Sequence, residues 1–340
     1  MTARVMNLFE SIGFSWLVSI MKLFTLQNPK EHIDNLIRSL GVPLFAFAVF
    51  LGIWHMGASQ VDTSLGKMPG PAAVWEQTIG LWEEHKAERV KEAAFYERQE
   101  ERNAKKLAKN PDATVKIRDY TGKPTYIDQI FTSLLTVFAG FLLASVVAIP
   151  LGILCGLSQT MYTAMNPIIQ LFKPVSPLAW LPIVTLVVSA LYVSDDPLFA
   201  KSFVNSAITV TLCCLWPTLI NTIVGVSSID NDLVNVSKVL RLNWHTKIIK
   251  IVLPSSVPMI FTGLRLSLGV GWMVLIAAEM LAQNPGLGKF VWDEFQNGSS
   301  QSLGRIMVAV ITIGFIGFLL DRLMLSLQKS FSWDKDAIVR

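Results

Sequence analysis

The chain has 340 residues, of which 52% are hydrophobic and only 16% are charged, and its mean hydropathy is +0.47. This composition excludes an ordinary soluble domain, and the apolar residues come in long blocks, as in a protein that crosses a membrane several times. The formal net charge of +4 is carried by basic residues at the ends of these blocks, so it indicates membrane topology and argues against nucleic-acid binding.

Residues 1–39 form an N-terminal arm that is only moderately apolar. Its first 27 residues contain four aromatic residues and a lysine: Phe9, Phe14, Trp16, Lys22 and Phe24. The arm is too interrupted for a membrane span, and no small-residue cleavage site follows an uninterrupted apolar core, as a signal peptide requires. We predict an amphipathic helix in the cytoplasmic interface, with a cleaved or inserted segment as the alternative.

Six stretches of the chain are long and apolar enough to cross a membrane, because a hydrocarbon core near 30 Å needs about 20 helical residues. In chain order they are Leu40–Met56, Ile130–Leu157, Ile168–Val193, Phe203–Val226, Pro258–Leu281 and Ile306–Leu325. Membrane helices tolerate internal proline when neighbours bond the freed carbonyls. We therefore predict an all-α membrane protein with kinked helices, the first at 40–57 and five more in a core at 129–327.

A long loop, residues 58–128, separates the first two predicted spans. It opens with Met68-Pro69-Gly70-Pro71 and becomes dense in mixed charge from Glu83 to Lys123. Opposite charges recur three and four residues apart, which supports an exposed helix. We predict a solvated helical insertion outside the membrane, and a docking surface for an external binding protein is the alternative.

Basic residues in the short loops predict the orientation of the spans. Counted from an inside N-terminus, Lys and Arg are more frequent in the cytoplasmic pieces, which include the turn at 158–173, than in the outer pieces. Both termini, including the tail at 328–340, are therefore predicted to lie in the cytoplasm.

Signatures of enzymes and cofactor sites are missing from the sequence. The glycine-rich stretch Gly286-Leu287-Gly288-Lys289 lacks the spacing and the following Ser or Thr of a phosphate loop. Three cysteines lie in apolar runs without a nearby histidine, which argues against a metal site: Cys155, Cys213 and Cys214. We predict that the chain binds no metal or cofactor, and that any ATP is used by another chain.

Two charges lie within the fifth predicted span, Arg265 and Glu279. On a helix they are separated by about 40° and roughly 21 Å, so they share a face near opposite membrane surfaces. Charges inside a membrane usually face a protein interior or an aqueous path. We assign both to a translocation pathway or gate, with structural pairing or snorkelling as the alternative.

Small and polar residues mark the fourth and fifth predicted spans as central. In the fifth, four small residues allow close helix approach: Gly263, Ser267, Gly269 and Gly271. In the fourth, Asn205, Thr209 and Asn221 are candidates for lining the pathway. Such polar groups equally well bond neighbouring helices, and the sequence leaves both options open.

A charged segment, Asn235–Pro254, lies between the fourth and fifth spans and carries Lys238, Arg241, Lys247 and Lys250. Its charge predicts a cytoplasmic location where a soluble partner can reach it. The segment resembles the cytoplasmic loop of ABC-importer permeases, which reads Glu-Ala-Ala, three residues, Gly, nine residues, Ile, one residue, Leu-Pro. Nine residues separate Arg241 from Ile251, and Leu253-Pro254 follow, whereas Asn235-Val236-Ser237 replaces Glu-Ala-Ala and Arg241 replaces Gly.

Further motifs resemble the nitrate branch of the nitrate/sulfonate/taurine/bicarbonate permeases. They are Phe172–Pro182, Phe261–Arg265, Ala277–Leu281, Trp292-Asp293 and Leu320-Asp321-Arg322. The resemblance implies the type I importer (MetI-like) fold in a bacterial inner membrane. It also implies an identical second permease copy, two cytoplasmic ATPases that bind ATP and Mg, and a periplasmic or lipid-anchored anion-binding protein.

The resemblance assigns the loop at 229–254 to coupling with the ATPases. The residues concerned are Asn235, Ser237, Lys238, Leu240, Arg241, Trp244, Leu253 and Pro254. On this hypothesis Leu240 and Trp244 supply apolar contact, while Lys238 and Arg241 pair with carboxylates of the ATPase. Arg241 in place of the flexible glycine should make the turn stiffer and more dependent on charge.

Nitrate is favoured by the resemblance alone. Arg265 with the Asn and Thr side chains of the fourth span would serve nitrate, cyanate or bicarbonate alike, and a permease for taurine or another sulfonate is a further alternative. From another class, the alternative is a stand-alone secondary anion transporter or channel. Such transporters often show inverted repeats with matched broken helices, and none is visible in the sequence.

Overall fold

The computed structural model describes residues 37–63, 66–110, 114–115, 117–193 and 198–331. The predicted N-terminal interfacial helix and most of the predicted tail lie outside these residues. The described chain is almost entirely helical, with two π-helical stretches, Ile37–Gly41 and Ile248–Val252, and one short antiparallel pair of strands, β1 (Asp62–Thr63) and β2 (Gly66–Lys67). The helices are α4 (Val42–Ser59), α5 (Pro71–Lys109), α6 (Tyr126–Leu157), α7 (Gln159–Phe172), α8 (Pro177–Leu191), α9 (Lys201–Ser227), α10 (Asn231–Val239), α11 (Trp244–Lys247), α12 (Leu253–Ala282), α13 (Leu287–Asn297) and α14 (Ser302–Phe331).

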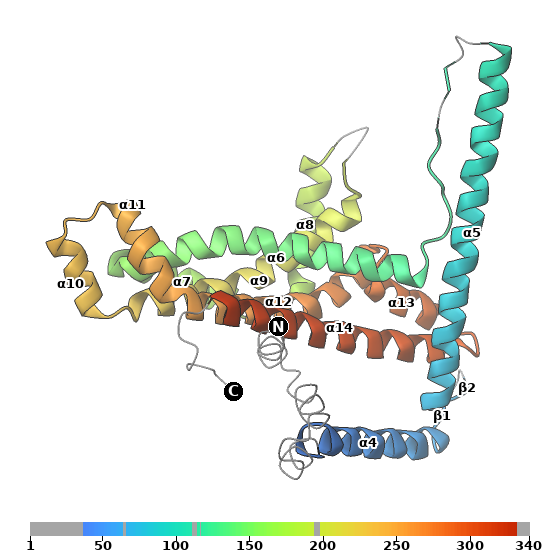
Figure 1. Ribbon diagram of the computed structural model, residues 1–340, viewed down its shortest axis with the longest axis horizontal. Coiled ribbons are helices and arrows are strands. Elements are labelled where there is room, and N and C mark those ends of the chain that lie inside the picture. Colours follow the sequence, from blue (N-terminus) through green and yellow to red (C-terminus); the bar gives the residue numbers. More distant parts are fainter. Residues whose placement is uncertain (1–36, 64–65, 111–113, 116, 194–197, 332–340) are drawn as a thin grey trace, which may run out of the picture.

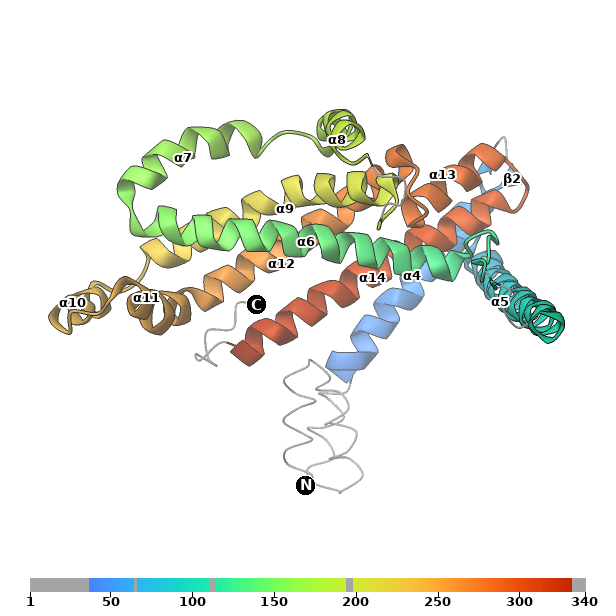
Figure 2. The same cartoon turned by 90° about the horizontal axis from the view of Figure 1, so that it is seen from above.

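Four long helices, α6, α9, α12 and α14, run side by side and form the body of the protein (Figures 1 and 2). Helices α10 and α11 lie at one end of this bundle, and α5 and α13 lie at the other; we call these the α10 end and the α5 end. Together with α4, the four helices match five of the six predicted spans, because each is long and apolar enough to cross a membrane.

The third predicted span, Ile168–Val193, is wrong as a continuous helix. Helix α7 ends at Phe172 and α8 starts at Pro177, and the two axes are bent by 101°. Pro174 and Pro177 cause the break because they remove backbone donors and restrict the residues before them. In Figure 2, α8 is seen end-on while the four long helices run across the view, so it lies crosswise to them.

Helix α9 lies between α6 and α12 and makes the most extensive contacts of the bundle with both. Glycines permit this close packing, because a Cβ at Gly271 would lie 2.4 Å from the sulfur of Cys214, and one at Gly263 would lie 2.8 Å from Asn221. The predicted role of small residues in the fifth span is confirmed at these two positions. A Cβ at Gly269 would meet nothing within 4 Å, so that glycine takes no part in the packing.

Ser267 of α12 is inserted into the backbone ladder of α9, next to Pro217. Its hydroxyl donates to the carbonyl of Cys214 and accepts from the amide of Thr218 (3.2 Å). The Ser267 hydroxyl therefore links a carbonyl and an amide four residues apart on α9, which would bond each other in a regular helix. The Thr218 hydroxyl bonds the same oxygen at 2.7 Å. A neighbouring helix therefore satisfies backbone groups beside a proline, as the sequence predicts for membrane helices.

The charged insertion forms the helix α5, which crosses the bundle at the α5 end roughly perpendicular to its axis (Figure 1). The prediction of an exposed helix is confirmed, but the helix begins at Pro71 and ends at Lys109. Proline suits this start because the first helical residue needs no amide donor. Ion pairs one turn apart support the helix, such as Arg89 with Glu92 at 2.6 Å.

Contacts with both α6 and α14 hold α5 in place. Arg89 pairs with Asp128 at 3.0 Å, and His85 contacts the hydroxyl of Thr125 at 2.7 Å, at the first turn of α6. Glu84 pairs with Arg305 at the first turn of α14. The segment before α6 returns along α5, where the Tyr120 hydroxyl donates to Glu88 (2.7 Å) and lowers the pKa of that carboxyl.

Candidate functional site

The connection between α9 and α12, residues 228–252, extends beyond the body of the bundle (Figure 1). It starts with α10, which is capped by the Asp230 carboxylate accepting from the amide of Asp232 at 2.9 Å. A tight turn then leads into α11, which continues through Ile248–Val252 directly into α12. A force on this connection therefore acts on both α9 and α12.

Arg241 closes α10 with a left-handed residue, at φ 47°. Its amide donates to the Lys238 carbonyl (3.1 Å), and the amide of Leu242 donates to the Ser237 carbonyl (3.0 Å). These two bonds form the Schellman motif, in which the left-handed position is usually glycine. The glycine of the permease pattern thus falls where the backbone favours it, and this chain adopts the same turn with arginine.

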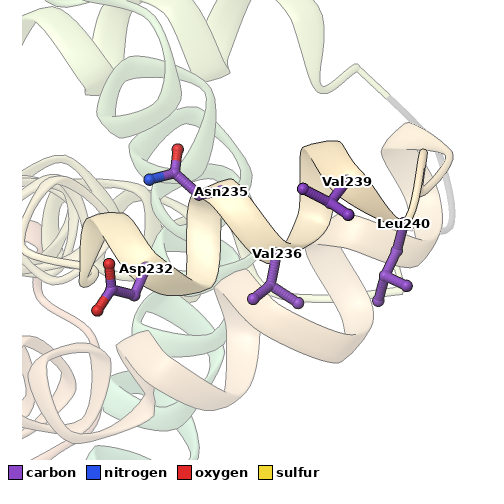
Figure 3. Close-up of a pocket in the computed structure, with 5 residues that line it drawn as sticks. All are labelled: Asp232, Asn235, Val236, Val239 and Leu240. Carbon is purple, nitrogen blue, oxygen red and sulfur yellow. The ribbon is translucent and has the colours of Figure 1, made fainter.

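One face of α10 presents a hollow of about 400 Å³, and Figure 3 shows the five residues that line it. They are Asp232, Asn235, Val236, Val239 and Leu240. Its apolar lining is accessible, with Val239 81% and Leu240 63% exposed, and Trp244 on the neighbouring α11 is 54% exposed. Exposed apolar side chains grouped in this way mark a surface for a protein partner.

The other predicted residues of this connection divide between surface and interior. Lys238 and Arg241 are exposed and do not line the hollow, whereas Ser237 is buried. Leu253 packs with Val226 and Ile153, at the junction of α12, α9 and α6. Pro254 occupies the first turn of α12. The structure thus brings Asn235 and Leu240 together at the hollow and leaves Lys238, Arg241 and Trp244 exposed on the same connection, while Ser237 is buried and Leu253 packs against the bundle.

Arg265 forms a two-pronged ion pair with Asp321 of α14, with Nε to Oδ1 at 2.5 Å and Nη2 to Oδ2 at 2.9 Å. The structural pairing considered as an alternative from the sequence is thus present. Asp321 was not predicted as the partner, although it belongs to one of the recognised motifs. The pair neutralises the guanidinium, so Arg265 does not offer a free positive charge to an anion in this state.

Glu279 is fully buried near the α5 end and lies far from Arg265 along α12. Its carboxylate accepts from the Ser133 hydroxyl (2.8 Å) and from the amide of Gly288 (3.0 Å). Ser133 in turn accepts from the amide of Leu287 (2.8 Å). Glu279 therefore caps the N-terminus of α13, a helix that the sequence did not predict, and joins it to α6.

Two of the three polar candidates of α9 bond the backbone of their own helix through their side chains. Thr209 donates to the carbonyl of Asn205 (2.8 Å), and the Asn221 amide donates to the carbonyl of Pro217 (2.8 Å). Asn205 and Thr209 are buried, and the Asn205 side-chain oxygen has no hydrogen-bond partner among the described residues. A role in the pathway remains a prediction for all three.

Within the residues that the structure describes, no group of three or more His, Cys, Asp or Glu side chains is placed to hold a metal ion.

Residues 148–333 match the family model of the binding-protein-dependent transport system inner membrane component. The match starts within α6 and extends beyond α14, so it includes the α9–α12 connection and both helices of the Arg265–Asp321 pair.

Curated relatives include permeases for two inorganic anions. The nitrate import permease protein NrtB of Synechocystis sp. is 40% identical over 59% of this chain and 68% of that protein, and that of Leptolyngbya laminosa is 40% identical over 58% and 65%. The bicarbonate transport system permease protein CmpB of Synechococcus elongatus is 30% identical over 88% of this chain and 91% of that protein. The similarity thus spans about two thirds of the nitrate permeases and nearly all of the bicarbonate permease.

Among solved structures, a chain of the MetNI methionine ABC transporter in an inward-facing conformation is similar, with a TM-score of 0.48 and 12% sequence identity. The similarity covers 61% of this chain and 96% of that one.

Proposed function

This chain belongs to the family of inner membrane components of binding-protein-dependent transport systems, and we propose that it forms the membrane pathway of an ATP-driven importer for a small inorganic anion, with nitrate as the favoured substrate. The observation that carries the proposal is the 40% identity to nitrate import permeases over 200 and 196 residues, together with a family match at 148–333 that includes the α9–α12 connection. The sequence holds no phosphate loop, so ATP hydrolysis is assigned to separate subunits.

Orientation follows from the distribution of charge. The α9–α12 connection carries Lys238, Arg241, Lys247 and Lys250, and short loops rich in Lys and Arg remain in the cytoplasm. The α10 end is therefore the cytoplasmic end of the bundle, and α5 lies outside. On this orientation both termini are cytoplasmic in a bacterial inner membrane.

Coupling to the ATPase follows from the continuity of the connection. A groove of the ATPase would receive α10, with Leu240 and Trp244 as apolar anchors and with Lys238 and Arg241 facing carboxylates. Closure of two ATPases around nucleotide would then move α10. Because α11 runs directly into α12, and Ser267 ties α12 to α9, the two helices would rotate as one body.

A second identical copy completes the proposed pathway. Helix α8 packs on α9 and α12 with one face and leaves its other face uncovered, where Leu186 is 72% and Leu191 is 81% exposed. An apolar face of this kind inside the membrane fits a symmetric contact between two permeases. An external binding protein would deliver the anion at the α5 end.

Uptake into proteoliposomes tests the function. The permease is reconstituted with its copurified ATPases and binding protein, and labelled nitrate, bicarbonate, cyanate and taurine are compared with and without ATP. We expect ATP-dependent accumulation of nitrate, and no accumulation with an ATPase that cannot hydrolyse ATP. Transport by the permease alone would instead favour a stand-alone secondary transporter or channel.

Bicarbonate is the second candidate, because the similarity to the bicarbonate permease covers 91% of that protein's length. The same experiment separates the two anions by their rates. ATP-dependent uptake of bicarbonate without uptake of nitrate would change the substrate and leave the importer mechanism intact.

Three substitutions at Arg241 separate its backbone role from its charge. Arg241→Gly should stabilise the turn by about 1 kcal/mol, because glycine adopts the left-handed conformation without steric cost. Arg241→Ala keeps the strain without the charge, and Arg241→Glu reverses the charge. We expect Arg241→Glu to lower coupled ATPase activity and transport while membrane insertion is unchanged, with Arg241→Gly much less affected.

Retention of the ATPase on the immobilised permease, measured as salt is raised, checks the charge at position 241. Salt should weaken the wild-type complex more than the Arg241→Gly complex, because screening acts on exposed charge pairs. Equal retention and equal ATPase activity for wild type and Arg241→Glu would remove the charge role.

A further inference from the structure

A cavity of about 350 Å³ lies between α7, the end of α6 and the end of α9. Five polar side chains of α7 line it: Gln159, Tyr162, Asn166, Gln170 and Lys173. Their spacing of three or four residues places them on one face of the helix. The opposite wall is largely apolar and includes Cys155 of α6 with Ile220 and Ile223 of α9.

The charge of this lining is entirely positive. Lys173 is the single charged residue among the lining residues, and no carboxylate is among them. Among the residues that the structure describes, Lys173 has no ion-pair partner. The cavity therefore combines one cation with neutral hydrogen-bonding groups, a combination that suits an anion and disfavours a metal ion.

Lys173 lies at the far end of α7, away from the end of the bundle where α6 and α7 meet. The sequence counted it with a cytoplasmic turn, but α7 carries it about 21 Å away from the end of α6, back along the bundle to the break before α8 (Figure 2). A lysine at that depth is costly unless it faces water or a counter-charge. Transporters often build their substrate sites at such broken helices.

The other cation of the described bundle interior is not available in the same way. Nε and Nη2 of Arg265 both donate to the Asp321 carboxylate. Lys173 is exposed at the cavity instead. The Gln170 amide donates to Asn166 Oδ1 (3.5 Å), which leaves the Asn166 amide hydrogens as donors for a ligand.

We propose that this cavity binds the transported inorganic anion on the cytoplasmic side of the pathway. Lys173 supplies the charge, while the Tyr162 hydroxyl and the Asn166 amide supply hydrogen bonds. The proposal rests on the proposed function for the class of its ligand. An anionic lipid headgroup shares the same chemistry, so the test must separate the lipid from the free anion.

Protection of a thiol placed in the cavity measures binding directly. Ser227 is exposed and lines the cavity, so Ser227→Cys adds a reactive thiol there, whereas the native cysteines are buried or half-buried. The rate of modification by a small methanethiosulfonate reagent is measured in the reconstituted importer, with nitrate or with the bulky anion gluconate. We expect nitrate, and not gluconate, to slow the reaction.

Variants at Lys173 test whether the protection of the thiol by nitrate depends on the positive charge of Lys173. Lys173→Gln should weaken nitrate protection about 10-fold or more, because a hydrogen bond to a charged group is lost, and Lys173→Arg should retain it. Lys201→Gln is the matched control, since Lys201 is an exposed lysine at the start of α9, away from the cavity. Equal protection in Lys173→Gln and wild type would overturn the proposal.

Two further measurements separate this site from the proposed function and from lipid. ATP-dependent nitrate uptake with unaltered protection in Lys173→Gln would leave the function standing and remove the site. Nitrate protection that depends on Lys173, in an importer that does not take up nitrate, would keep an anion site and remove the proposed substrate. Protection that requires anionic lipid and is insensitive to nitrate would overturn the proposal in favour of a headgroup.

Discussion

Replacing Arg265 with leucine should destabilise the permease and strongly reduce its transport, whereas the double variant Arg265→Leu/Asp321→Leu should recover most of the stability. The single change leaves the Asp321 carboxylate unpaired in an apolar helix, where a charge costs about 2.5–3.5 kcal/mol at the membrane centre. The two side chains are 37% and 38% exposed in the isolated chain, so we expect about 2 kcal/mol.

Thermal unfolding in detergent measures this difference, and uptake by the same preparations reports on function. Wild type, Arg265→Leu, Asp321→Leu and the double variant form a double-mutant cycle, whose interaction term should be large because the two residues are in contact. A double variant that is stable but inactive would show that Arg265 also acts in the pathway. Equal stability of Arg265→Leu and wild type would contradict the structural role.

Replacing Glu279 with alanine should detach the start of α13 from the bundle and lower the free energy of unfolding by about 3 kcal/mol. The substitution removes the acceptor for Ser133 and for the amide of Gly288, and both residues are buried. Each unsatisfied buried donor costs about 1–3 kcal/mol. Unfolding midpoints and hydrogen exchange of residues 287–297 check the stability and the local opening.

Glu279→Gln is the matched control, because it retains the size and one acceptor oxygen and should lose less stability. Gly286→Ala probes the same contact from the other side, since its Cβ would lie 2.1 Å from the Glu279 carboxylate. We expect it to resemble Glu279→Ala. Normal stability and normal exchange in Glu279→Ala, with altered uptake, would instead favour the gate role predicted from the sequence.

Long apolar stretches were the most predictable part of the fold, because the thickness of a membrane sets the length of a span. The third span is apolar enough to cross a membrane but is broken into two helices, because the backbone bends by 101° around Pro174 and Pro177 and hydropathy does not detect such a bend. Helix α13 was missed because it is short and follows directly after a glycine, with a cap supplied by Glu279 from another helix. Such a cap cannot be recognised from local sequence.

The candidate site was predicted from its resemblance to a family motif more than from the physical properties of its residues. The motif predicted the connection around Arg241, but the left-handed backbone that explains its glycine became visible only in the folded turn. The sequence placed Arg265 and Glu279 on one face, whereas each has a separate partner, Asp321 and Ser133, on another helix. These partners are distant in sequence, so only the tertiary structure pairs them.

The crossing of α5 has a consequence for how the bundle can open. Helix α5 forms ion pairs with Asp128 at the first turn of α6 and with Arg305 at the first turn of α14, so it connects the ends of these two helices. On the proposed orientation, the α5 end would act as a hinge outside the membrane. The helices would then separate most at the α10 end, where we propose that the ATPases bind.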